Sequence, residues 1–564
     1  MLDRLENLTL FSVLESSAEH FAEKPALSLI DTHPMTYAEL RAQVQQLSLF
    51  LYDQGIIHGD RVALLSENKP NWVIAYLAIV TMGAVAVPIL PDFHASEVQH
   101  ILRHSRSKAI FISERLYDKL EEGHFDDLDI FLIDDFSVVP SQISKDRLSD
   151  MIKSGEIELT KIKQAALKLS GRIPSKVQEQ DLASIIYTSG TTGHSKGVML
   201  THKNIVFDAI ATLDIQTVTS TDRLLSILPL SHTYENTIGM MIPLICGAAI
   251  YYIEKPPTAR VLIPAMEKIK PTMMLTVPLI IEKIFKTRIL PQLTKNKLMR
   301  SLYRLPPMRK QLHRLAGKKL YKLFGGHLHF FGIGGASLSP EVERFLREAN
   351  FPYAIGYGLT ETSPLIAGTS PDKTRFRSTG PALPKIELKI VPQNAGQKDG
   401  EIWVRGENVM KGYFKDPERT QEVITSDGWL KTGDLGELDK DGYLYIKGRL
   451  KNMLLGPSGE NIYPEQIESV LNESDHVLES LVFQQEGRLV ARIHLNYERL
   501  DEEFHINKLS DAQYEKKIRE LLDSIRQQTN ERLSTFSRLQ RMIEQPEPFE
   551  KTPTQKIKRY LYIN

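Results

Sequence analysis

Short apolar segments alternate with segments of helical periodicity along the chain, and this alternation restricts the possible fold more than any other feature of the sequence. Strands separated by helices form βαβ units, which build parallel sheets covered by helices. The pattern runs from residue 35 to about 113 and resumes from residue 183 to about 357. In its first part it predicts helices over residues 37–51 and 71–82 and strands over residues 61–65 and 85–87. We therefore expect an α/β fold for most of the chain.

Three further regions divide the chain. Residues 114–180 are polar with acidic clusters, which predicts a mostly peripheral excursion. From residue 386 the hydrophobic period becomes two, in the segments IELKIV, EIWVRG and YLYIKG, which is typical of a β-rich subdomain. After residues 448–451 a smaller α+β pattern follows. We expect a large N-terminal domain over residues 1–450, made of α/β layers and the β-rich subdomain, and a small α+β domain over residues 451–564.

The composition limits the class of protein. Of the 564 residues, 42% are hydrophobic and 25% are charged, as in folded globular chains. The 70 basic and 70 acidic residues balance, so no overall field attracts nucleic acid. A single cysteine, Cys246, excludes an internal disulfide and an all-cysteine metal site. Because the first thirty residues also lack the charged stub and apolar core of a secretion signal, we expect a cytoplasmic protein.

One apolar run, residues 237–253, carries no charge. It is shorter than the roughly 20 residues of a membrane-spanning helix, and two glycines and a proline interrupt it. We expect a buried helix followed by a buried strand.

The segment SIIYTSGTTGHSKGVMLTH, residues 184–202, carries the strongest signal for chemistry. An apolar strand leads into a loop of hydroxyl and glycine residues, and Lys196 follows before a helix that begins at about His202. Converging backbone N–H groups, hydroxyls and a lysine suit a polyphosphate, although a surface turn also collects Gly, Ser and Thr. The spacing differs from that of a P-loop, which disfavours a P-loop kinase. The loop consists of Thr188, Ser189, Gly190, Thr191, Thr192 and Gly193.

This loop resembles the motif YTSGTTGxxKGV of the AMP-forming acyl-CoA synthetases, which belong to the adenylate-forming superfamily. Further segments similar to motifs of that family follow in the same order, so the resemblance covers nearly the whole chain. It implies the adenylate-forming enzyme fold with a mobile C-terminal domain. It also implies that ATP, Mg²⁺, CoA and a carboxylic acid meet at one site, where the acid is converted to an acyl-AMP and then to a thioester.

The second motif is AIGYGLTETSP, residues 354–364. In the family, its aromatic residue packs on adenine, its threonine contacts phosphate and its glutamate holds Mg²⁺. The resemblance implies these roles for Tyr357, Thr360 and Glu361, and a carboxylate is a ligand that Mg²⁺ prefers. Taken alone, the segment is also compatible with a glycine-rich corner that exposes a glutamate.

Other positions resemble the rest of the family's nucleotide site. Gly334, Gly335 and Ala336 match the adenine shelf, where small side chains let a flat base approach the backbone. In GWLKTGDLGEL, Asp434 matches the aspartate that holds the ribose, although an aspartate in a turn is the commoner explanation of Thr-Gly-Asp alone. In YIKGRLKNM, Arg449 matches the ribose-binding arginine.

Two lysines match positions that the family uses to move its C-terminal domain. Lys451 falls on the hinge, and Gly448 nearby permits a large backbone rotation. In FEKTPTQKIKRYLYIN, Lys556 matches the lysine that enters the active site during adenylation and stabilises charge there. The chain has Asn452 where the family often has aspartate, and Gln555 where it usually has glycine. A basic solvated tail is the alternative reading of this segment.

The segment ILPLSHTYENT, residues 227–237, resembles the part of the family that passes near the acyl carboxylate. His232 is its candidate for substrate contact, and a buried, hydrogen-bonded histidine is equally compatible. The residues after His232 are more similar to those of long-chain fatty acyl-CoA synthetases than of short-chain ones. We therefore expect a long-chain fatty acid CoA ligase. The alternatives are a medium-chain or aryl-acid CoA ligase, an acyl carrier protein ligase, or a non-catalytic fatty-acid-binding scaffold.

A basic segment lies within the predicted N-terminal domain. Residues 283–327 contain 13 Lys or Arg and no Asp or Glu, interleaved with leucines, which is typical of a basic amphipathic surface helix. The hypothesis is a peripheral contact with the inner face of the membrane. Capture of the CoA phosphates, or pairing with the acidic region 114–158, are the other interpretations.

Overall fold

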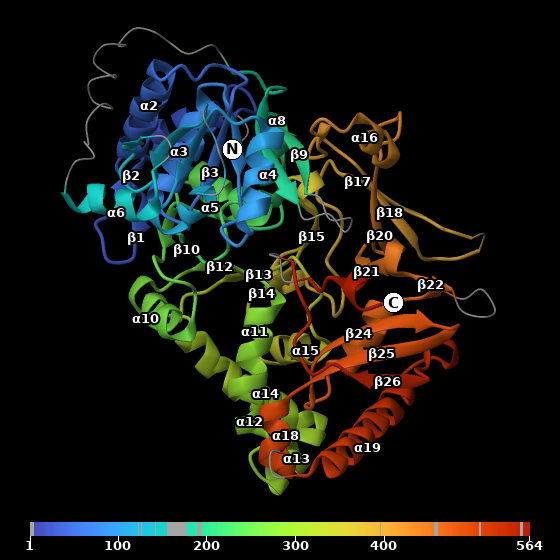
Figure 1. The fold of residues 1–564 in the computed structure, drawn as a ribbon. Helices are drawn as coiled ribbons and strands as arrows, with labels where there is room; N and C mark the ends of the chain where they lie inside the picture. The colour runs from blue at the N-terminus through green and yellow to red at the C-terminus, as the bar shows by residue number, and fades with distance from the viewer. Residues whose placement is uncertain are drawn as a thin grey trace.

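The computed structural model describes residues 5–121, 123, 125, 127–140, 143–154, 177–188, 195–394, 396–455, 461–506, 509–552 and 556–563. Two large sheets with their helices form the N-terminal part, and a four-stranded and a three-stranded sheet follow toward the C-terminus, with two further pairs of short strands (Figure 1). Within these ranges, no helix has the length and apolar character that a membrane crossing requires. The α/β fold class is confirmed.

The first large sheet has eight strands, and its central strands are parallel. The strands lie in the spatial order β19 (Gly412–Tyr413), β9 (Lys196–Thr201), β8 (Leu182–Thr188), β4 (Val85–Pro88), β3 (Arg61–Leu65), β5 (Ala109–Ile112), β6 (Asp129–Leu132) and β7 (Val138–Val139). The strands β19, β9 and β7 are antiparallel to their neighbours. The predicted phosphate loop therefore joins two antiparallel strands.

The second large sheet has seven strands, all parallel except the last pair. The order is β14 (Tyr353–Ile355), β13 (Phe330–Ile333), β12 (Met273–Thr276), β10 (Arg223–Ser226), β11 (Ala249–Tyr252), β1 (Pro25–Leu29) and β2 (Met35–Thr36). One hydrophobic core contains residues of both large sheets. The carboxyl ends of parallel strands are where open α/β sheets bind ligands.

Helix α3 (Pro70–Thr81) explains how the two large sheets share a core. Residues 72–81 are all buried, and the helix packs against β3 and β4 of one sheet and β1 of the other. A helix that is apolar on every side requires such surroundings. The other helices of this part are α1 (Leu10–Phe21), α2 (Tyr37–Asp53), α4 (Ala95–Ser105), α5 (Asp118–Glu121), α6 (Lys145–Ser154), α8 (His202–Leu213), α9 (Ile242–Cys246), α10 (Ala259–Ile269), α11 (Pro278–Ile284), α12 (Leu290–Leu293), α13 (Lys297–Arg304), α14 (Pro306–Leu323) and α15 (Pro340–Glu348).

The region after residue 386 is rich in strands, as predicted. Four antiparallel strands form one sheet, in the order β17 (Glu387–Val391), β18 (Gly400–Arg405), β20 (Leu430–Leu438) and β21 (Leu444–Arg449), with α16 (Pro417–Val423) nearby. Beyond residue 461 a separate hydrophobic core surrounds a three-stranded sheet. Its elements are α17 (Pro464–Leu471), β24 (Val477–Gln485), β25 (Arg488–Leu495), α18 (Tyr497–Phe504), α19 (Asp511–Asn530) and β26 (Arg541–Glu544). The domain boundary near residue 451 stays a prediction.

Two expectations about local structure have clear outcomes. The apolar run 237–253 is buried, as predicted: it contains most of a π-helix, η3 (Tyr234–Met241), then α9 and β11. The expectation that residues 114–180 are mostly peripheral was partly wrong, because β6 extends the eight-stranded sheet beside β5 with three buried residues. The strand has four residues, of which three are apolar, and this length is too short for a periodic signal. Residues 155–176 lie outside the described residues.

Candidate active site

The predicted phosphate loop lies between β8 and β9, where Thr188 is paired with Lys196. The Thr188 hydroxyl is buried and has no hydrogen-bond partner among the described residues, so its polar group can still serve a ligand. Thr201 ends β9 and begins α8 through a capping box with Asn204, which fixes the base of the hairpin. Five loop residues lie outside the described residues: Ser189, Gly190, Thr191, Thr192 and Gly193.

Lys196, Glu361 and Tyr413 form a triangle of contacts beside this loop. The Lys196 ammonium donates to the Tyr413 hydroxyl at 2.6 Å and to Glu361 Oε1 at 3.0 Å. The Tyr413 hydroxyl donates to the same Oε1 at 2.8 Å. Burial alone would raise the pKa of Glu361, but the Lys196 charge and the hydrogen bonds from both partners outweigh burial, so the pKa is lowered. Glu361 is therefore an ionised carboxylate at neutral pH.

Tyr413 is the residue of this cluster that sequence reasoning missed. It lies in β19, whose two residues pair with Val198 and Met199 of β9. This pairing places the Tyr413 hydroxyl between Lys196 and Glu361. A strand of two residues that pairs with a distant segment leaves no periodic signal in a single sequence.

Asp434, Tyr357 and Arg449 form a second cluster. The antiparallel pairing of β20 with β21 sets Asp434 opposite Arg449, whose Nε lies 2.7 Å from Asp434 Oδ1. The Tyr357 hydroxyl donates to Asp434 Oδ2 at 2.7 Å. Asp434 is 4% exposed, and burial raises the pKa of its carboxyl against the opposing effects of Arg449, Tyr357 and Lys556. The structure thus brings together three residues that the sequence assigned to one nucleoside.

The segment with the second motif connects the two clusters. Tyr357 lies in the short strand β15 (Tyr357–Gly358), and Thr360 and Glu361 begin the 3-10 helix η5 (Thr360–Thr362). Tyr357 contacts the Asp434 cluster and Glu361 contacts Lys196. Thr360 lies between Tyr357 and Glu361 in the sequence, and its side chain is partly buried. One short segment therefore spans the distance between the two groups.

Gly334, Gly335 and Ala336 follow β13 at the carboxyl end of the seven-stranded sheet. Gly335 has a φ of +84°, which favours glycine, and both Gly335 and Ala336 are exposed. The Tyr234 ring packs against Gly334, because a Cβ there would lie 3.1 Å from the ring. These residues leave a strip of backbone open to a flat ligand.

His232 lies on the loop between β10 and η3 and is partly buried. Its Nδ1 accepts a hydrogen bond from the backbone N–H of Tyr234 at 3.2 Å, so in the neutral ring Nε2 carries the proton. Burial and the Lys556 charge lower the pKa of His232 to about 4. The imidazole is therefore neutral at physiological pH and has one N–H to donate.

Lys556 reaches this region from the C-terminal part of the chain. Its ammonium interacts electrostatically with Arg449, Asp434, Glu361 and His232. Burial and the Arg449 charge lower the pKa of Lys556 against the attraction of the two carboxylates. Its side chain nevertheless remains accessible to solvent. The charge of Lys556 thus acts on residues of both clusters and on the histidine.

Lys451 is exposed in the 3-10 helix η7 (Leu450–Asn452), which connects β21 to the C-terminal part. The Asn452 side chain donates to Glu465 Oε1 at 2.6 Å and ties this connection to α17. A Cβ on Gly448 would lie 2.8 Å from Glu465 Oε2, so glycine allows α17 to approach this closely. The hinge role of Lys451 stays a prediction.

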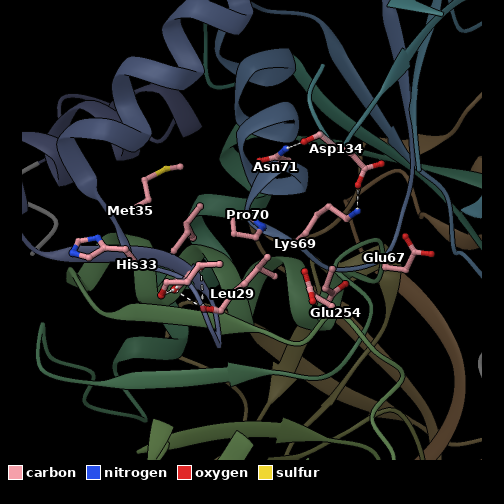
Figure 2. A pocket seen from close by; sticks show the side chains of 13 residues that line it. Leu29, His33, Met35, Glu67, Lys69, Pro70, Asn71, Asp134 and Glu254 are labelled. Carbon is pink, nitrogen blue, oxygen red and sulfur yellow. Dashed lines mark hydrogen bonds and ion pairs between the residues drawn. The ribbon is translucent and has the colours of Figure 1, made fainter. Parts of the chain in front are cut away.

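Two cavities lie near the sheets. The larger, of ≈ 440 Å³, lies beside the start of α3 and is lined by none of the predicted site residues (Figure 2). Asn68 in its wall donates to the Leu228 carbonyl at 2.5 Å and accepts from the Leu230 N–H at 2.9 Å, which fixes the loop that carries His232. The smaller, of ≈ 50 Å³, is almost entirely apolar and lies between β10, β12 and β13 and the helices α10 and α11. It includes Ile227, the first residue of that loop.

Comparison with known proteins identifies a family and several similar relatives. The family model described as "AMP-binding enzyme" matches residues 14–414. "4-coumarate--CoA ligase 1" of Arabidopsis thaliana is 30% identical over 485 residues, which are 82% of this chain and 79% of that protein. "Long-chain-fatty-acid--CoA ligase" of Bacillus subtilis (strain 168) is 30% identical over 501 residues, which are 85% of this chain and 83% of that protein.

A solved structure has a similar fold. ATP-bound MatB from Rhodopseudomonas palustris superimposes with a TM-score of 0.75 and 24% sequence identity, and the match covers 98% of both chains. The predicted adenylate-forming fold is confirmed.

Proposed function

Because the chain belongs to the family of AMP-binding enzymes, we propose that it is an ATP-dependent CoA ligase for long-chain fatty acids. In the first step, a carboxylate oxygen of the acid attacks the α-phosphorus of ATP, which forms acyl-AMP and releases pyrophosphate. In the second, the CoA thiolate attacks the acyl carbon and AMP leaves. We expect the enzyme to act in the cytoplasm.

One observation carries this proposal: the Lys556 ammonium interacts electrostatically with Asp434, Glu361 and His232, although these residues come from distant parts of the chain. A site that joins a nucleotide to an acid needs a cation where the negative charges of phosphate and carboxylate approach each other. Lys556 supplies such a cation. A surface tail would place it away from these groups.

The nucleotide end of the proposal uses the two clusters. Asp434 is suited to accept hydrogen bonds from two ribose hydroxyls, with Arg449 beside it, and Tyr357 and the open strip at Gly334, Gly335 and Ala336 are suited to the adenine. The loop after Thr188, with Lys196 and Thr360, is suited to the phosphates. The unpartnered Thr188 hydroxyl supports this assignment.

The residues present also fit Mg²⁺. Glu361 is ionised, and Lys196 and Tyr413 both contact its Oε1, which leaves Oε2 without a contact from either residue. A carboxylate oxygen beside phosphates is the ligand set that Mg²⁺ prefers. The ion would neutralise phosphate charge when it is bound, and Glu361 would hold it.

His232 is suited to the acid. Its pKa of about 4 keeps the ring neutral, so Nε2 can donate a hydrogen bond to one carboxylate oxygen without forming an ion pair that would have to be broken. The acid keeps its charge on the other oxygen, which is the nucleophile. The fixed loop around His232 supports this orientation.

The apolar cavity beside Ile227 supports an aliphatic acid. Its lining is apolar except for Thr276 and Arg288. Its volume of ≈ 50 Å³ holds only a few methylene groups, so a long chain requires α10 and α11 to move apart. The aryl-acid alternative predicts instead a flat ligand and no need for this space.

The test is acid-dependent release of pyrophosphate across saturated acids from acetate to palmitate and across 4-coumarate, with CoA or holo acyl carrier protein as acceptor. We expect the highest kcat/KM for long acids with CoA, because each buried methylene group contributes about 0.8 kcal/mol of binding. A maximum at medium-chain or aryl acids would support CoA ligase activity and contradict the preference for long-chain acids. Absence of pyrophosphate release with every acid would contradict an enzymatic function and favour a non-catalytic binding scaffold.

A further inference from the structure

Helix α14 presents a basic and apolar face that no other described part of the chain covers. We infer that this face docks on the surface of an anionic lipid bilayer. The inference deepens the proposed function, on which it rests for its purpose, because a lipid bilayer is where long-chain fatty acids dissolve. We define the α14 surface by five exposed side chains toward the C-terminal end of the helix, Arg314, Leu315, Lys318, Lys319 and Lys322.

The spacing of these residues places them on one side of the helix. Leu315 lies three and four positions before Lys318 and Lys319, and Lys322 follows by the same intervals, so the side chains are neighbours. Leu315 is 61% exposed although it is a leucine. Such a surface combines attraction of its cations to anionic lipid with an apolar contact from the leucine.

The opposite side of α14 is held firmly by the body of the protein. Arg309 donates two hydrogen bonds to Glu348 of α15, at 3.2 and 2.8 Å. The backbone at Gly317 approaches Ala349 so closely that a Cβ there would lie 2.5 Å from the alanine side chain. His313 is 1% exposed. The helix therefore cannot turn its cations inward without losing these contacts.

The charges of the α14 surface are not neutralised within the described residues. Arg309 and His313 have a carboxylate within 4.0 Å, and the four cations of the α14 surface have none. The suggested pairing with the acidic region 114–158 was wrong for its described residues, since the ion pairs there join Arg115 to Glu67, Lys145 to Asp118 and Lys69 to Asp134. Other acidic partners are absent from the segment itself, because residues 283–327 contain no Asp or Glu.

The position of α14 suits a docking surface. Figure 1 shows α13 and α14 at the end of the molecule opposite α2. At the corner between the two helices Leu305 is 53% exposed, which adds a second apolar side chain to the same end. The apolar cavity includes Leu323, the last residue of α14, so the proposed acyl space begins at the base of this helix. Lipid contact would bring the acid to that side of the enzyme.

Co-sedimentation with vesicles tests the inference without catalysis. The vesicles contain phosphatidylcholine alone or with about one third phosphatidylglycerol, at about 0.1 M salt. We expect the wild-type chain to sediment with the anionic vesicles only. The variant Arg314→Gln, Lys318→Gln, Lys319→Gln, Lys322→Gln should bind them about 100-fold more weakly, and Leu315→Ser should reduce binding by a smaller factor.

The matched control removes the same number of charges elsewhere, through Lys398→Gln, Lys440→Gln, Lys516→Gln and Arg519→Gln, which are all exposed. It should bind like the wild type. Equal binding of wild type to neutral and anionic vesicles would overturn the inference, as would unchanged binding of the four-fold α14 variant. So would a higher KM for CoA with intact lipid binding in that variant, which would assign the surface to the CoA phosphates. Adenylation of a short soluble acid, measured beside this, reports failure of the proposed function separately.

Discussion

Tyr413 touches Lys196 in two ways, since the ammonium lies 2.6 Å from the hydroxyl and 4.3 Å from the centre of the ring. Lys196 can therefore turn toward a phosphate while Tyr413 keeps its own hydrogen bond to Glu361. At the residue scale, this makes the tyrosine a positioning residue for both neighbours. A phenylalanine would keep the ring and lose the hydrogen bonds.

We expect Tyr413→Phe to raise the Mg²⁺ concentration at half-maximal activity by about tenfold, because a hydrogen bond to a charged group contributes about 1.5–3 kcal/mol. The melting temperature of the ligand-free protein should change little, since Lys196 and Glu361 still pair directly. Tyr443→Phe is the control, because its hydroxyl donates to the backbone carbonyl of the exposed Lys373, outside the candidate site. An unchanged Mg²⁺ dependence would mean that Tyr413 does not position Glu361.

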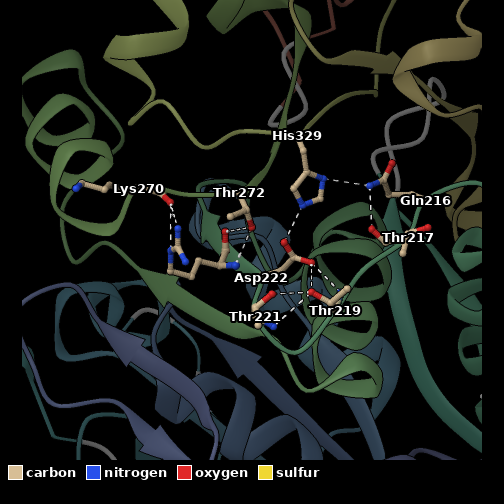
Figure 3. A network of polar contacts seen from close by, with 9 residues as sticks. Gln216, Thr217, Thr219, Thr221, Asp222, Lys270, Thr272 and His329 are labelled. Atoms are coloured by element: carbon tan, nitrogen blue, oxygen red, sulfur yellow. Dashed lines mark hydrogen bonds and ion pairs between the residues drawn. The ribbon is translucent and has the colours of Figure 1, made fainter.

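Asp222 is a buried carboxylate outside the candidate active site. It accepts hydrogen bonds from His329 at 2.7 Å and from the N–H and hydroxyl of Thr219 at 2.7 and 3.0 Å (Figure 3). Burial would raise the pKa of Asp222, but these hydrogen bonds lower it to about 2. The network joins the amino ends of β10 and β13, opposite the end that carries the site.

Asp222→Asn should lower the free energy of unfolding by about 1–3 kcal/mol near neutral pH. Because the pKa of Asp222 is lowered in the folded protein, its carboxylate stabilises the fold above about pH 4. This contribution is lost as the pH falls toward about 2. Melting temperatures of variant and wild type should therefore converge in acid. Asp31→Asn, at a side chain that is 87% exposed, should show no such trend. A constant difference between pH 6 and about pH 3 would show that the charge of Asp222 does not stabilise the fold.

At the scale of elements, the position of the C-terminal part decides which groups meet. Lys286 donates to the Asn472 carbonyl at 2.7 Å, and Asn461 donates to Gln397 at 3.4 Å. Tyr463 also hydrogen-bonds to Asp399. Together these contacts hold the arrangement in which Lys556 faces the site. A rotation about Lys451 would have to break them.

Lys556→Ala should remove acid-dependent formation of the adenylate and spare thiolysis of supplied acyl-AMP. The reason is that the cation serves the step in which carboxylate and phosphate charges meet, and thiolysis has no such step. Lys558→Ala is the control, because Lys558 pairs with Glu550 outside the site. Rapid-quench assays of the two half-reactions check the result. Equal loss of both half-reactions would contradict the proposed rotation.

The elements that could be predicted are those with a long period or a cap. The strand over residues 61–65 and the helix over residues 37–51 appear nearly as expected, the helix beginning at Tyr37 after the capping box of Thr36. Strand β9 could not be predicted because it is short and contains both polar and apolar residues. Strand β19 could not be predicted because it has two residues. Their stability comes from pairing with each other and with β8, which a single sequence does not reveal.

At the scale of the whole molecule, the family motifs named residues that the fold brings together, whereas local chemistry alone named fewer of them. Tyr357, Asp434 and Arg449 were named from a family resemblance and lie together. Local chemistry gave only the phosphate loop, because the site joins segments between residues 188 and 556 whose approach depends on the tertiary fold. Tyr413 had no motif, so only the structure identified it.

The pairing of β19 with β9 also has a consequence for biosynthesis. β9 lies between β8 and β19, so without β19 one side of β9 is an open edge with unpaired backbone groups and several apolar side chains. Exposed edges of this kind pair with other chains and promote aggregation. During translation, residues 196–201 must wait for residues 412–413 before that edge closes. When Gly412 and Tyr413 pair with β9, they therefore also end the period in which the nascent chain is most prone to self-association.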